Sequence, residues 1–497
     1  MIVRDLLEQG SPSATALAVV GGPSVTYEAL RSQVDALTAQ LHRFGIRRGD
    51  RVAIALPNGL EMIASFLAAA TAGTAAPLNP AYKAEEVRFY LEDTGAHALI
   101  VSRTGAEEAK SAAGDRVLII EAVADASGQA QFVANGKRDS SGSTAPPDPD
   151  DIALVLHTSG TTSRPKRVPL SHANLTASVR NIAQTYRLTE GDVSLCVMPL
   201  FHVHGLMASM LATLYTGGTV VIAPRFNPLS FWATVRDYGA SWYSAVPTIH
   251  QALLSRARSG ERPRGAENLR FIRSCSAALP AQMMAEMEDR FGAPVLEAYG
   301  MTEAAHQMAS NPLPPGARKP GSVGRGTGVS IAILDKRGGI LPPNQRGEVA
   351  IKGDNVFGGY EENAEANAAA FTNGWFRTGD QGFLDTDGYL TLTGRIKELI
   401  NRGGEKISPR EIDEALLAHP AVAEAVCFGM PDRVYGEEVA AAVVLRGPAT
   451  EKELIAHCKS LLADFKCPKA VWIVDSLPRT ASGKVQRRAV AAEILNR

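Results

Sequence analysis

The sequence predicts an α/β protein with parallel sheets and more than one domain. In the N-terminal half, short apolar runs alternate with amphipathic stretches, a pattern typical of parallel strands joined by helices. At 497 residues the chain is too long for one ordinary hydrophobic core. Hydrophobic residues make up 45% and charged residues 21%, values that are typical of a globular protein.

The N-terminal half carries the clearest local signals. Apolar positions at helical spacing predict helices over residues 27–41, 60–72 and 174–187. Residues 124–150, rich in Ala, Ser, Gly, Asp and Pro, predict a surface connection. Strands are predicted at residues 51–56, 98–101, 117–120, 152–156, 194–198, 219–222, 241–245, 270–275 and 294–296.

The pattern changes twice in the C-terminal half. After Gly326, short strands and turns predict a β-rich subdomain, with strands at residues 330–334, 347–352 and 388–393. The second change lies near residues 394–397, and the remaining stretch predicts a separate α+β domain. The predicted domains are therefore residues 1–395 and residues 396–497.

Charge and cysteine usage restrict the partners and the compartment. Lys plus Arg number 51 against 52 Asp plus Glu, which argues against an extended surface for nucleic acid or an anionic membrane. The five cysteines form no Cys-x-x-Cys pair, which indicates a reducing compartment. The first ten residues lack the apolar core of a signal peptide, and no stretch is long enough to span a bilayer. We expect a cytoplasmic protein.

A Ser/Thr-rich segment follows the predicted strand at residues 152–156. Its hydroxyls, close backbone N–H groups and cations suit a polyphosphate. It does not match the Walker pattern, because no Gly-Lys-Ser/Thr closes it, and alone it would also suit a solvated turn. The residues concerned are Thr158, Ser159, Gly160, Thr161, Thr162, Ser163, Arg164 and Lys166.

Further clusters follow in a fixed order. They read YGMTE at 299–303, WFRTGD at 375–380, GRIKELI at 394–400, GGEKI at 403–407 and PRTASGK at 478–484. With the Ser/Thr segment, they make essentially the whole chain resemble the adenylate-forming superfamily of acyl-CoA synthetases, peptide-synthetase adenylation domains and luciferases. The resemblance implies a large N-terminal domain of αβαβα sheets with a β-rich subdomain, and a small mobile α+β C-terminal domain.

The resemblance also implies a reaction and its cofactors. A carboxylate would be esterified with AMP from ATP, with Mg²⁺ present, and a thiol such as that of CoA would then displace the AMP. The implied phosphate-binding residues are Thr158, Ser159, Gly160, Thr161, Thr162 and Lys166. The other implied residues are Ala277 and Tyr299 near adenine, Thr302 on the α-phosphate, Glu303 on Mg²⁺, Asp380 and Arg395 on the ribose, Lys397 as hinge and Lys484 as catalytic lysine.

Histidines point to a small polar acid. His and Ser donate to oxygens, and a protonated His would offset negative charge, whereas a long acyl chain would need an apolar tunnel. Within the superfamily, segments such as FHVHG at 201–205, VPTIH at 246–250 and RSCS at 273–276 resemble the oxalate–CoA ligases. That resemblance implies oxalate as the acid and His202, Ser276 and His306 as its contacts, with His204 as the next candidate.

Some readings stay open. Arg167 stands where the superfamily has a glycine, so it predicts either backbone strain or an extra contact to phosphate or solvent. FKCPK at 465–469 is either a basic segment for CoA or a turn. Alternatives are a ligase for another short acid, transfer to a carrier protein, or a nucleotide-binding protein inactivated by Arg167. The presence of Lys484, Glu303 and Asp380 favours an enzyme.

Overall fold

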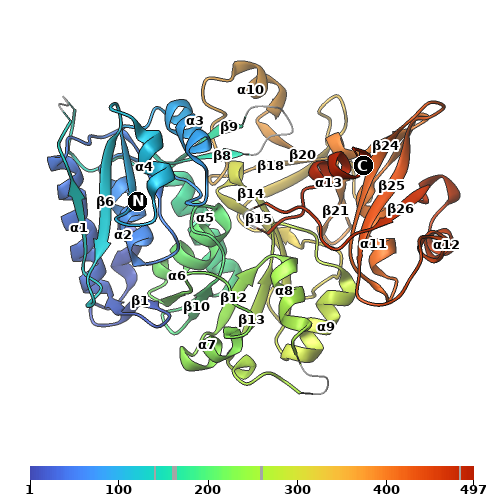
Figure 1. The fold of residues 1–497 in the computed structure, drawn as a ribbon, viewed down its shortest axis with the longest axis horizontal. Coiled ribbons are helices and arrows are strands. Elements are labelled where there is room, and N and C mark those ends of the chain that lie inside the picture. Colours follow the sequence, from blue (N-terminus) through green and yellow to red (C-terminus); the bar gives the residue numbers. More distant parts are fainter. Residues whose placement is uncertain (139–141, 159–164, 258–260, 481–482, 497) are drawn as a thin grey trace.

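The computed structural model describes residues 1–138, 142–158, 165–257, 261–480 and 483–496. These residues form four sheets, and the chain runs from the N-terminal sheet at one side of Figure 1 to the C-terminal sheet at the other. Among them, no helix combines the length and apolar character needed to cross a bilayer.

The N-terminal sheet has seven strands. Its central strands are parallel, and antiparallel strands close both edges. The Ser/Thr-rich segment connects β8 to β9 at one of these edges. In spatial order the strands are β7 (Ala130–Ala134), β6 (Leu118–Ala124), β5 (Ala98–Ser102), β3 (Arg51–Ala55), β4 (Thr74–Pro77), β8 (Ile152–Thr158) and β9 (Lys166–Ser171).

A nine-stranded sheet packs next to it. The run from β14 to β1 is parallel, and β15, β16 and β2 add antiparallel edges. In spatial order the strands are β16 (Arg325–Gly326), β15 (His306–Ser310), β14 (Val295–Met301), β13 (Phe271–Ser274), β12 (Trp242–Ala245), β10 (Val193–Cys196), β11 (Thr219–Ile222), β1 (Thr15–Val19) and β2 (Ser24–Thr26).

Three apolar clusters define the layers. The largest joins inner faces of both sheets through the helices between them, and α2 is apolar on nearly every face, as a helix packed on all sides must be. Two further clusters cover the outer faces, which gives the αβαβα order. Inner helices are η1 (Val3–Gln9), α1 (Tyr27–Arg43), α2 (Leu60–Ala72), α5 (His172–Tyr186), η2 (His204–Leu211) and α6 (Ala212–Tyr215); outer ones are α3 (Ala84–Thr94), α4 (Glu107–Ala113), α7 (Phe231–Asp237), α8 (Pro247–Leu254) and α9 (Ala281–Phe291).

Two smaller sheets follow along the chain. The β-rich sheet carries β17 (Ser330–Leu334), β18 (Gly347–Lys352), β19 (Phe371–Thr372), β20 (Trp375–Leu384) and β21 (Leu390–Arg395), with α10 (Ala364–Ala370) beside it. The last sheet and the helices that pack on it have their own apolar clusters and together are called the small domain below. It contains β22 (Ile400–Arg402), β23 (Glu405–Ile407), β24 (Val422–Asp432), β25 (Gly436–Leu445) and β26 (Ala470–Ile473), with α11 (Pro409–Leu417), α12 (Glu451–Leu461) and α13 (Arg487–Leu495).

The small domain meets the large body along a loosely filled seam. Gln251 of α8 donates from Nε2 to the Ala423 carbonyl at 2.8 Å. Beside this bond lies a pocket of about 420 Å³ between α8, α9 and α11, with Leu254, Met283 and Leu417 among its lining residues. The seam therefore combines polar contacts with unfilled space.

Most predicted elements are present near their predicted positions, and the structure adds further elements that were not predicted; three differences are informative. The predicted surface connection at 124–150 contains β7, an alternating strand that pairs with β6. Helix α9 had not been predicted, although Met284, Met287 and Phe291 lie at helical spacing on its buried face. Strand β14 extends to Met301, because β15 supplies an antiparallel partner for its second half.

We predict that Gly300→Ala destabilises the protein strongly. A β-carbon on Gly300 would lie 1.9 Å from the His306 carbonyl oxygen, since β14 and β15 approach closely there. The backbone would have to separate, at a cost of about 3 kcal/mol in the free energy of unfolding, measured by urea denaturation. Gly358→Ala is the matched control, because nothing lies within 4 Å of its added carbon. Equal stability of the two variants would contradict the prediction.

Candidate active site

One end of the site is organised around the buried carboxylate of Asp380. The Tyr299 hydroxyl donates to one of its oxygens, and the Arg395 Nε lies 2.9 Å from the other. Asp380 and Arg395 are opposite each other on β20 and β21. Burial and the nearby Asp380 charge raise the pKa of Tyr299 well above its usual value, so this hydroxyl stays a donor. Asp380 lies within β20, so its position is fixed by the sheet.

The other end contains Glu303 in the short 3₁₀ turn η4 (Thr302–Ala304). Its Oε1 accepts a hydrogen bond of 2.8 Å from the Tyr360 hydroxyl, and the Lys166 ammonium lies 4.3 Å from the centre of the Tyr360 ring. Burial raises the pKa of Glu303. Burial, followed by the charge of Lys397, lowers the pKa of Lys166. Lys166, Glu303 and Lys397 are thus brought together.

The remaining residues proposed for the nucleotide have simpler surroundings. Thr158 ends β8 and pairs with Lys166 across the β8–β9 ladder. Thr302 opens η4 beside Glu303, and Ala277 is half-buried after β13. Ser159, Gly160, Thr161 and Thr162 lie outside the described residues.

Glu303 is compatible with a magnesium ion held mainly by substrate phosphates. Mg²⁺ usually takes one or two carboxylates from the protein and completes its shell with phosphate oxygens and water. Among the described residues, no group of three or more His, Cys, Asp or Glu side chains could hold a metal. A single buried carboxylate beside Lys166 meets the first requirement and needs the phosphates for the second.

Lys484 links this nucleotide region to the histidines. Lys484 is exposed, and the preceding Gly483 carbonyl accepts from the Thr248 hydroxyl of the large body at 3.4 Å. Desolvation by the surrounding protein, followed by the charge of Arg395, lowers the pKa of Lys484. The Lys484 charge also lowers the pKa of His202. The lysine therefore lies within electrostatic reach of both regions.

His204 connects the three residues predicted to contact the acid. Its backbone N–H donates to His202 Nδ1 at 3.1 Å, and its Nδ1 lies 3.0 Å from the Ser276 Oγ. Its ring stacks on the His306 ring with centroids 5.2 Å apart. His202, Ser276 and His306 thus form one cluster, and His204, the next candidate, is its fully buried centre.

The expectation that a protonated histidine offsets substrate charge is wrong for this cluster. Burial is the main cause that lowers the pKa of His202, to about 4, and of His204 and His306 well below the usual value. The charge of Arg273 adds to the effect on His204 and His306. These rings are neutral hydrogen-bonding groups near pH 7.

The backbone around the cluster is strained. Ser276, Ala305 and His306 have φ values of 71°, 46° and 98°, which non-glycine residues rarely adopt. His204 also opens η2, a π-helix. Both features are concentrated at functional sites in proteins.

Two residues of the site were missed by the sequence reasoning. Arg273 lies fully buried in β13 behind the histidines. A charged residue inside the predicted strand at 270–275 was a usable signal, since arginine is rarely buried without a partner. Tyr360 follows two glycines in an irregular segment, and no pattern in the sequence distinguishes it.

The structure resolves the open question about Arg167. Its backbone is extended within β9, so strain from a positive φ is absent. Its side chain does not point to solvent: it pairs with Glu362, lies 3.2 Å from Glu361 Oε2 and 3.8 Å from Asp93 Oδ2. Arg167 therefore ties the base of the β8–β9 hairpin to the segment that carries Tyr360.

The segment at 465–469 has partners within the small domain. Lys466 Nζ lies 2.7 Å from Glu411, and Lys469 Nζ lies 3.3 Å from Asp432. These ion pairs favour the reading of this segment as a structural turn.

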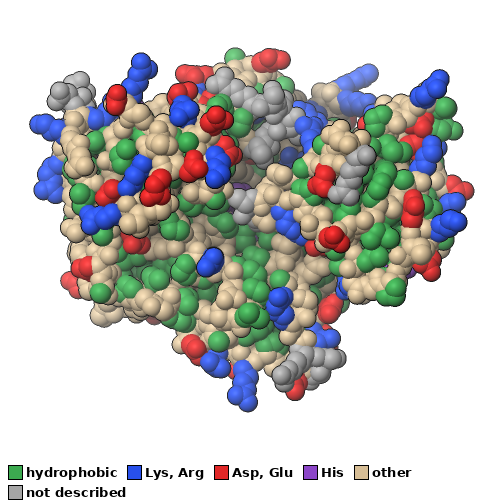
Figure 2. Space-filling view, viewed as in Figure 1, with side chains coloured by type: hydrophobic (Ala, Val, Ile, Leu, Met, Phe, Trp, Pro, Cys, Tyr) green, Lys and Arg blue, Asp and Glu red, His purple; other side chains and the backbone are tan. Residues whose placement is uncertain are grey.

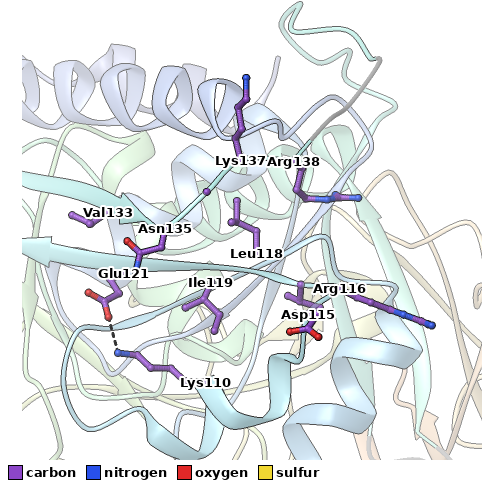
Figure 3. Close-up of a pocket in the computed structure, with 12 residues that line it drawn as sticks. Lys110, Asp115, Arg116, Leu118, Ile119, Glu121, Val133, Asn135, Lys137 and Arg138 are labelled. Carbon is purple, nitrogen blue, oxygen red and sulfur yellow. Dashed lines mark hydrogen bonds and ion pairs between the residues drawn. The ribbon is translucent and has the colours of Figure 1, made fainter.

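The molecular surface offers a second hollow, at the edge of the seven-stranded sheet (Figure 3). This pocket of about 490 Å³ is lined by residues between 110 and 138, and its described lining includes none of the predicted site residues. Its Lys110 and Glu121 pair with each other at 2.7 Å. Figure 2 shows positive and negative side chains interspersed over one face of the molecule.

Lys166, Lys484 and the buried carboxylates of Asp380 and Glu303 lie where the large αβαβα body meets the small α+β unit. Cations and carboxylates gathered between two such parts are typical of an enzyme that acts on a nucleotide. Residues 7–361 match the AMP-binding enzyme family, and residues 411–484 match the AMP-binding enzyme C-terminal domain. The chain belongs to the AMP-binding enzyme family.

Similar proteins cover nearly the whole chain. An oxalate–CoA ligase of Arabidopsis thaliana is 50% identical over 98% of this chain and 96% of its own length. One of Saccharomyces cerevisiae is 47% identical, over 89% of this chain and 87% of its own. The structure of o-succinylbenzoate coenzyme A synthetase from Bacillus subtilis, in complex with ATP and magnesium ion, is 31% identical with a TM-score of 0.83, covering 98% of both chains.

We predict that His202 makes stability depend on pH. Its pKa falls from 6.5 to about 4 on folding. Between these pH values the unfolded chain therefore binds a proton at His202 that the folded protein does not bind. The free energy of unfolding should therefore fall as the pH drops from about 6.5 towards about 4, by up to about 1.4 kcal/mol per pH unit for this group. Urea denaturation of the wild type and of His202→Asn would show a shallower dependence in the variant. Parallel curves would contradict the prediction.

We also predict that Arg167→Gly, which restores the superfamily residue, destabilises this protein. The change leaves Asp93, Glu361 and Glu362 facing one another without the partly buried guanidinium, at a cost of about 1–3 kcal/mol. Arg167→Lys keeps the charge and should lose less. Urea midpoints measure both effects. An Arg167→Gly protein as stable as the wild type would refute the stabilising role of the Arg167 ion pairs.

Proposed function

We propose that this protein ligates oxalate to CoA at the expense of ATP, through an oxalyl-adenylate, and releases AMP and pyrophosphate. The identity of 50% to an oxalate–CoA ligase over nearly the full length supports the reaction. The observation that carries the proposal is the position of Lys484, whose charge acts both on Asp380 and Arg395 and on His202.

The proposed binding roles are those that the resemblance to the family implies. Asp380 accepts from the ribose hydroxyls beside Arg395, Tyr299 and Ala277 line the adenine site, and Thr302 bonds the α-phosphate. The connection Thr158, Ser159, Gly160, Thr161, Thr162 and Lys166 holds the β- and γ-phosphates. His202, Ser276 and His306 hold the carboxylate of oxalate that does not react.

In the first step, an oxygen of the reacting carboxylate attacks the α-phosphorus of ATP, and the bond to pyrophosphate breaks. The attacking carboxylate and the phosphates are all anionic, so the step needs cations that are already in place. Lys484 lies between the two regions and neutralises both reactants, while Lys166 stabilises the departing pyrophosphate. Mg²⁺ at Glu303, when bound, supplies further neutralisation of the phosphates, as the relative holding ATP and magnesium suggests.

In the second step, the CoA sulfur attacks the acyl carbon, AMP leaves with the carbon–oxygen bond pair, and the thiol proton is released to solvent. The long thiol cofactor needs a path to the acyl carbon that Lys484 would obstruct. We propose that residues 396–497 rotate about Lys397, an exposed residue of η5 (Ile396–Glu398), to remove Lys484 and bring the loop at 403–407 to the site.

The five thiols (Cys196, Cys275, Cys427, Cys458 and Cys467) are all buried and form no disulfide. This supports a reducing compartment, and we propose that the protein acts in the cytoplasm.

The proposal predicts that oxalate outperforms other acids in the presence of ATP, Mg²⁺ and CoA. Pyrophosphate release from oxalate, malonate, propionate and a cinnamate should give oxalate the highest kcat/KM by at least about 10-fold, because oxalate alone in this panel has a second carboxylate bonded directly to the reacting one. Lys484→Ala is the control: oxalate turnover should fall by about 100-fold or more while ATP binding changes little. A higher kcat/KM for another acid would refute the choice of oxalate, and ATP binding without pyrophosphate release would refute an enzymatic role.

A further inference from the structure

Arg273 presents a fully buried guanidinium whose neighbours are all uncharged. From β13, its Nη2 donates to His306 Nε2 and to Gln307 Oε1, both at 3.0 Å. Its Nη1 donates to the Ser244 Oγ and its Nε to the Tyr186 hydroxyl oxygen, each at 2.9 Å. The side chain is thus held on every side, by neutral partners only.

This buried cation has no anionic partner in the described part of the chain. None of the ion pairs within 4.0 Å among the described residues includes Arg273, whose exposed fraction is 0%. Arginine cannot shed its proton as lysine can, and an isolated buried charge is costly. The cost is offset when an anion binds nearby, and the cluster in contact with Arg273 is the one proposed to hold the second carboxylate.

One arm of the network fixes His306. Its ring is neutral, because burial and the Arg273 charge lower its pKa. Since Nε2 accepts from the permanently protonated guanidinium, the ring proton must lie on Nδ1. His306 therefore offers an N–H donor from Nδ1, and no described residue accepts from it.

The second arm fixes Ser276. The Ser244 Oγ accepts from Arg273, so its own proton is directed to His204 Nε2, 2.6 Å away. A neutral His204 that accepts at Nε2 carries its proton on Nδ1 and donates it to the Ser276 Oγ at 3.0 Å. The Ser276 hydroxyl proton is then left for the substrate.

The tautomer of His202 is fixed by a backbone hydrogen bond, and it too leaves a donor for the substrate. Its Nδ1 accepts the His204 N–H at 3.1 Å, so its proton lies on Nε2. All three predicted contacts consequently act as donors, and two of them owe this to Arg273.

We propose that Arg273 determines the specificity of the acyl pocket for acids with a second anionic group. It acts as a positioning residue, aligning His306 directly and Ser276 through Ser244 and His204, and it supplies the positive charge that the neutral histidines lack. The inference rests on the proposed function and deepens it, since it explains why a dicarboxylate is preferred to a neutral analogue of the same shape.

Oxamate provides the sharpest probe, because it has the shape of oxalate but a neutral amide in place of one carboxylate. Pyrophosphate release by the full chain should be measured with both acids for the wild type, Arg273→Gln and Arg273→Lys. Arg273→Gln should lower kcat/KM for oxalate by about 100-fold and that for oxamate by less than about 10-fold, with an unchanged KM for ATP. Arg273→Lys should recover part of the preference for oxalate. Arg270→Gln, a partly exposed arginine at the start of the same strand, should behave as the wild type.

A second pair of variants tests the network if Arg273→Gln does not fold. The Asn amide of His306→Asn replaces the Nδ1 donor, whereas that of His306→Gln replaces Nε2, so His306→Asn should keep at least about 10-fold more oxalate activity. Equal losses in this pair, or an unchanged oxalate-to-oxamate ratio in folded Arg273→Gln, would overturn the inference alone. A wild-type protein that uses no oxalate would instead overturn the proposed function.

Discussion

The carboxylate of Asp380 is the contact on which the cleft depends. Tyr299 reaches it from the nine-stranded sheet, and Arg395 reaches it from the neighbouring strand of the β-rich sheet. A carboxylate this deeply buried would be costly without a cation beside it, so the pair with Arg395 is a condition for its presence. Because Arg395 is the last residue of β21, the same contact also fixes where the small domain begins.

The cleft separates two kinds of electrostatics. Around the nucleotide region, Lys166, Lys397 and Lys484 carry charge in a partly open setting, and burial, followed by the charge of Lys397, lowers the pKa of Lys166. Such a set is stable only with anions between its members, which suits a polyphosphate. Behind the acyl pocket, the histidines are neutral and one sealed guanidinium, Arg273, provides the charge. The open region can exchange its ions with solvent, whereas the buried charge of Arg273 can be balanced only by an anion in the acyl pocket.

The sequence predicted the αβαβα organisation and the family because these depend on local patterns and on short ordered motifs. It could not predict features that depend on contacts between distant segments. The neutrality of His306 follows from burial and from Arg273, which is 33 residues away in the chain. The role of Arg167 required Glu361 and Glu362 to lie beside β9. Local composition also led to a wrong prediction: β7 was assigned to a surface connection because it is short and lies in a stretch rich in turn-forming residues.

The pocket between α8, α9 and α11 affects how easily the two parts of the protein can move. Tightly interdigitated side chains resist sliding, because each must leave the space between its neighbours before it can move to the next position. A seam that already contains about 420 Å³ of space has room for water. Its two faces can therefore slide past each other without opening a new cavity. The rotation proposed for residues 396–497 would use this space, and larger side chains that fill the seam should restrict that rotation.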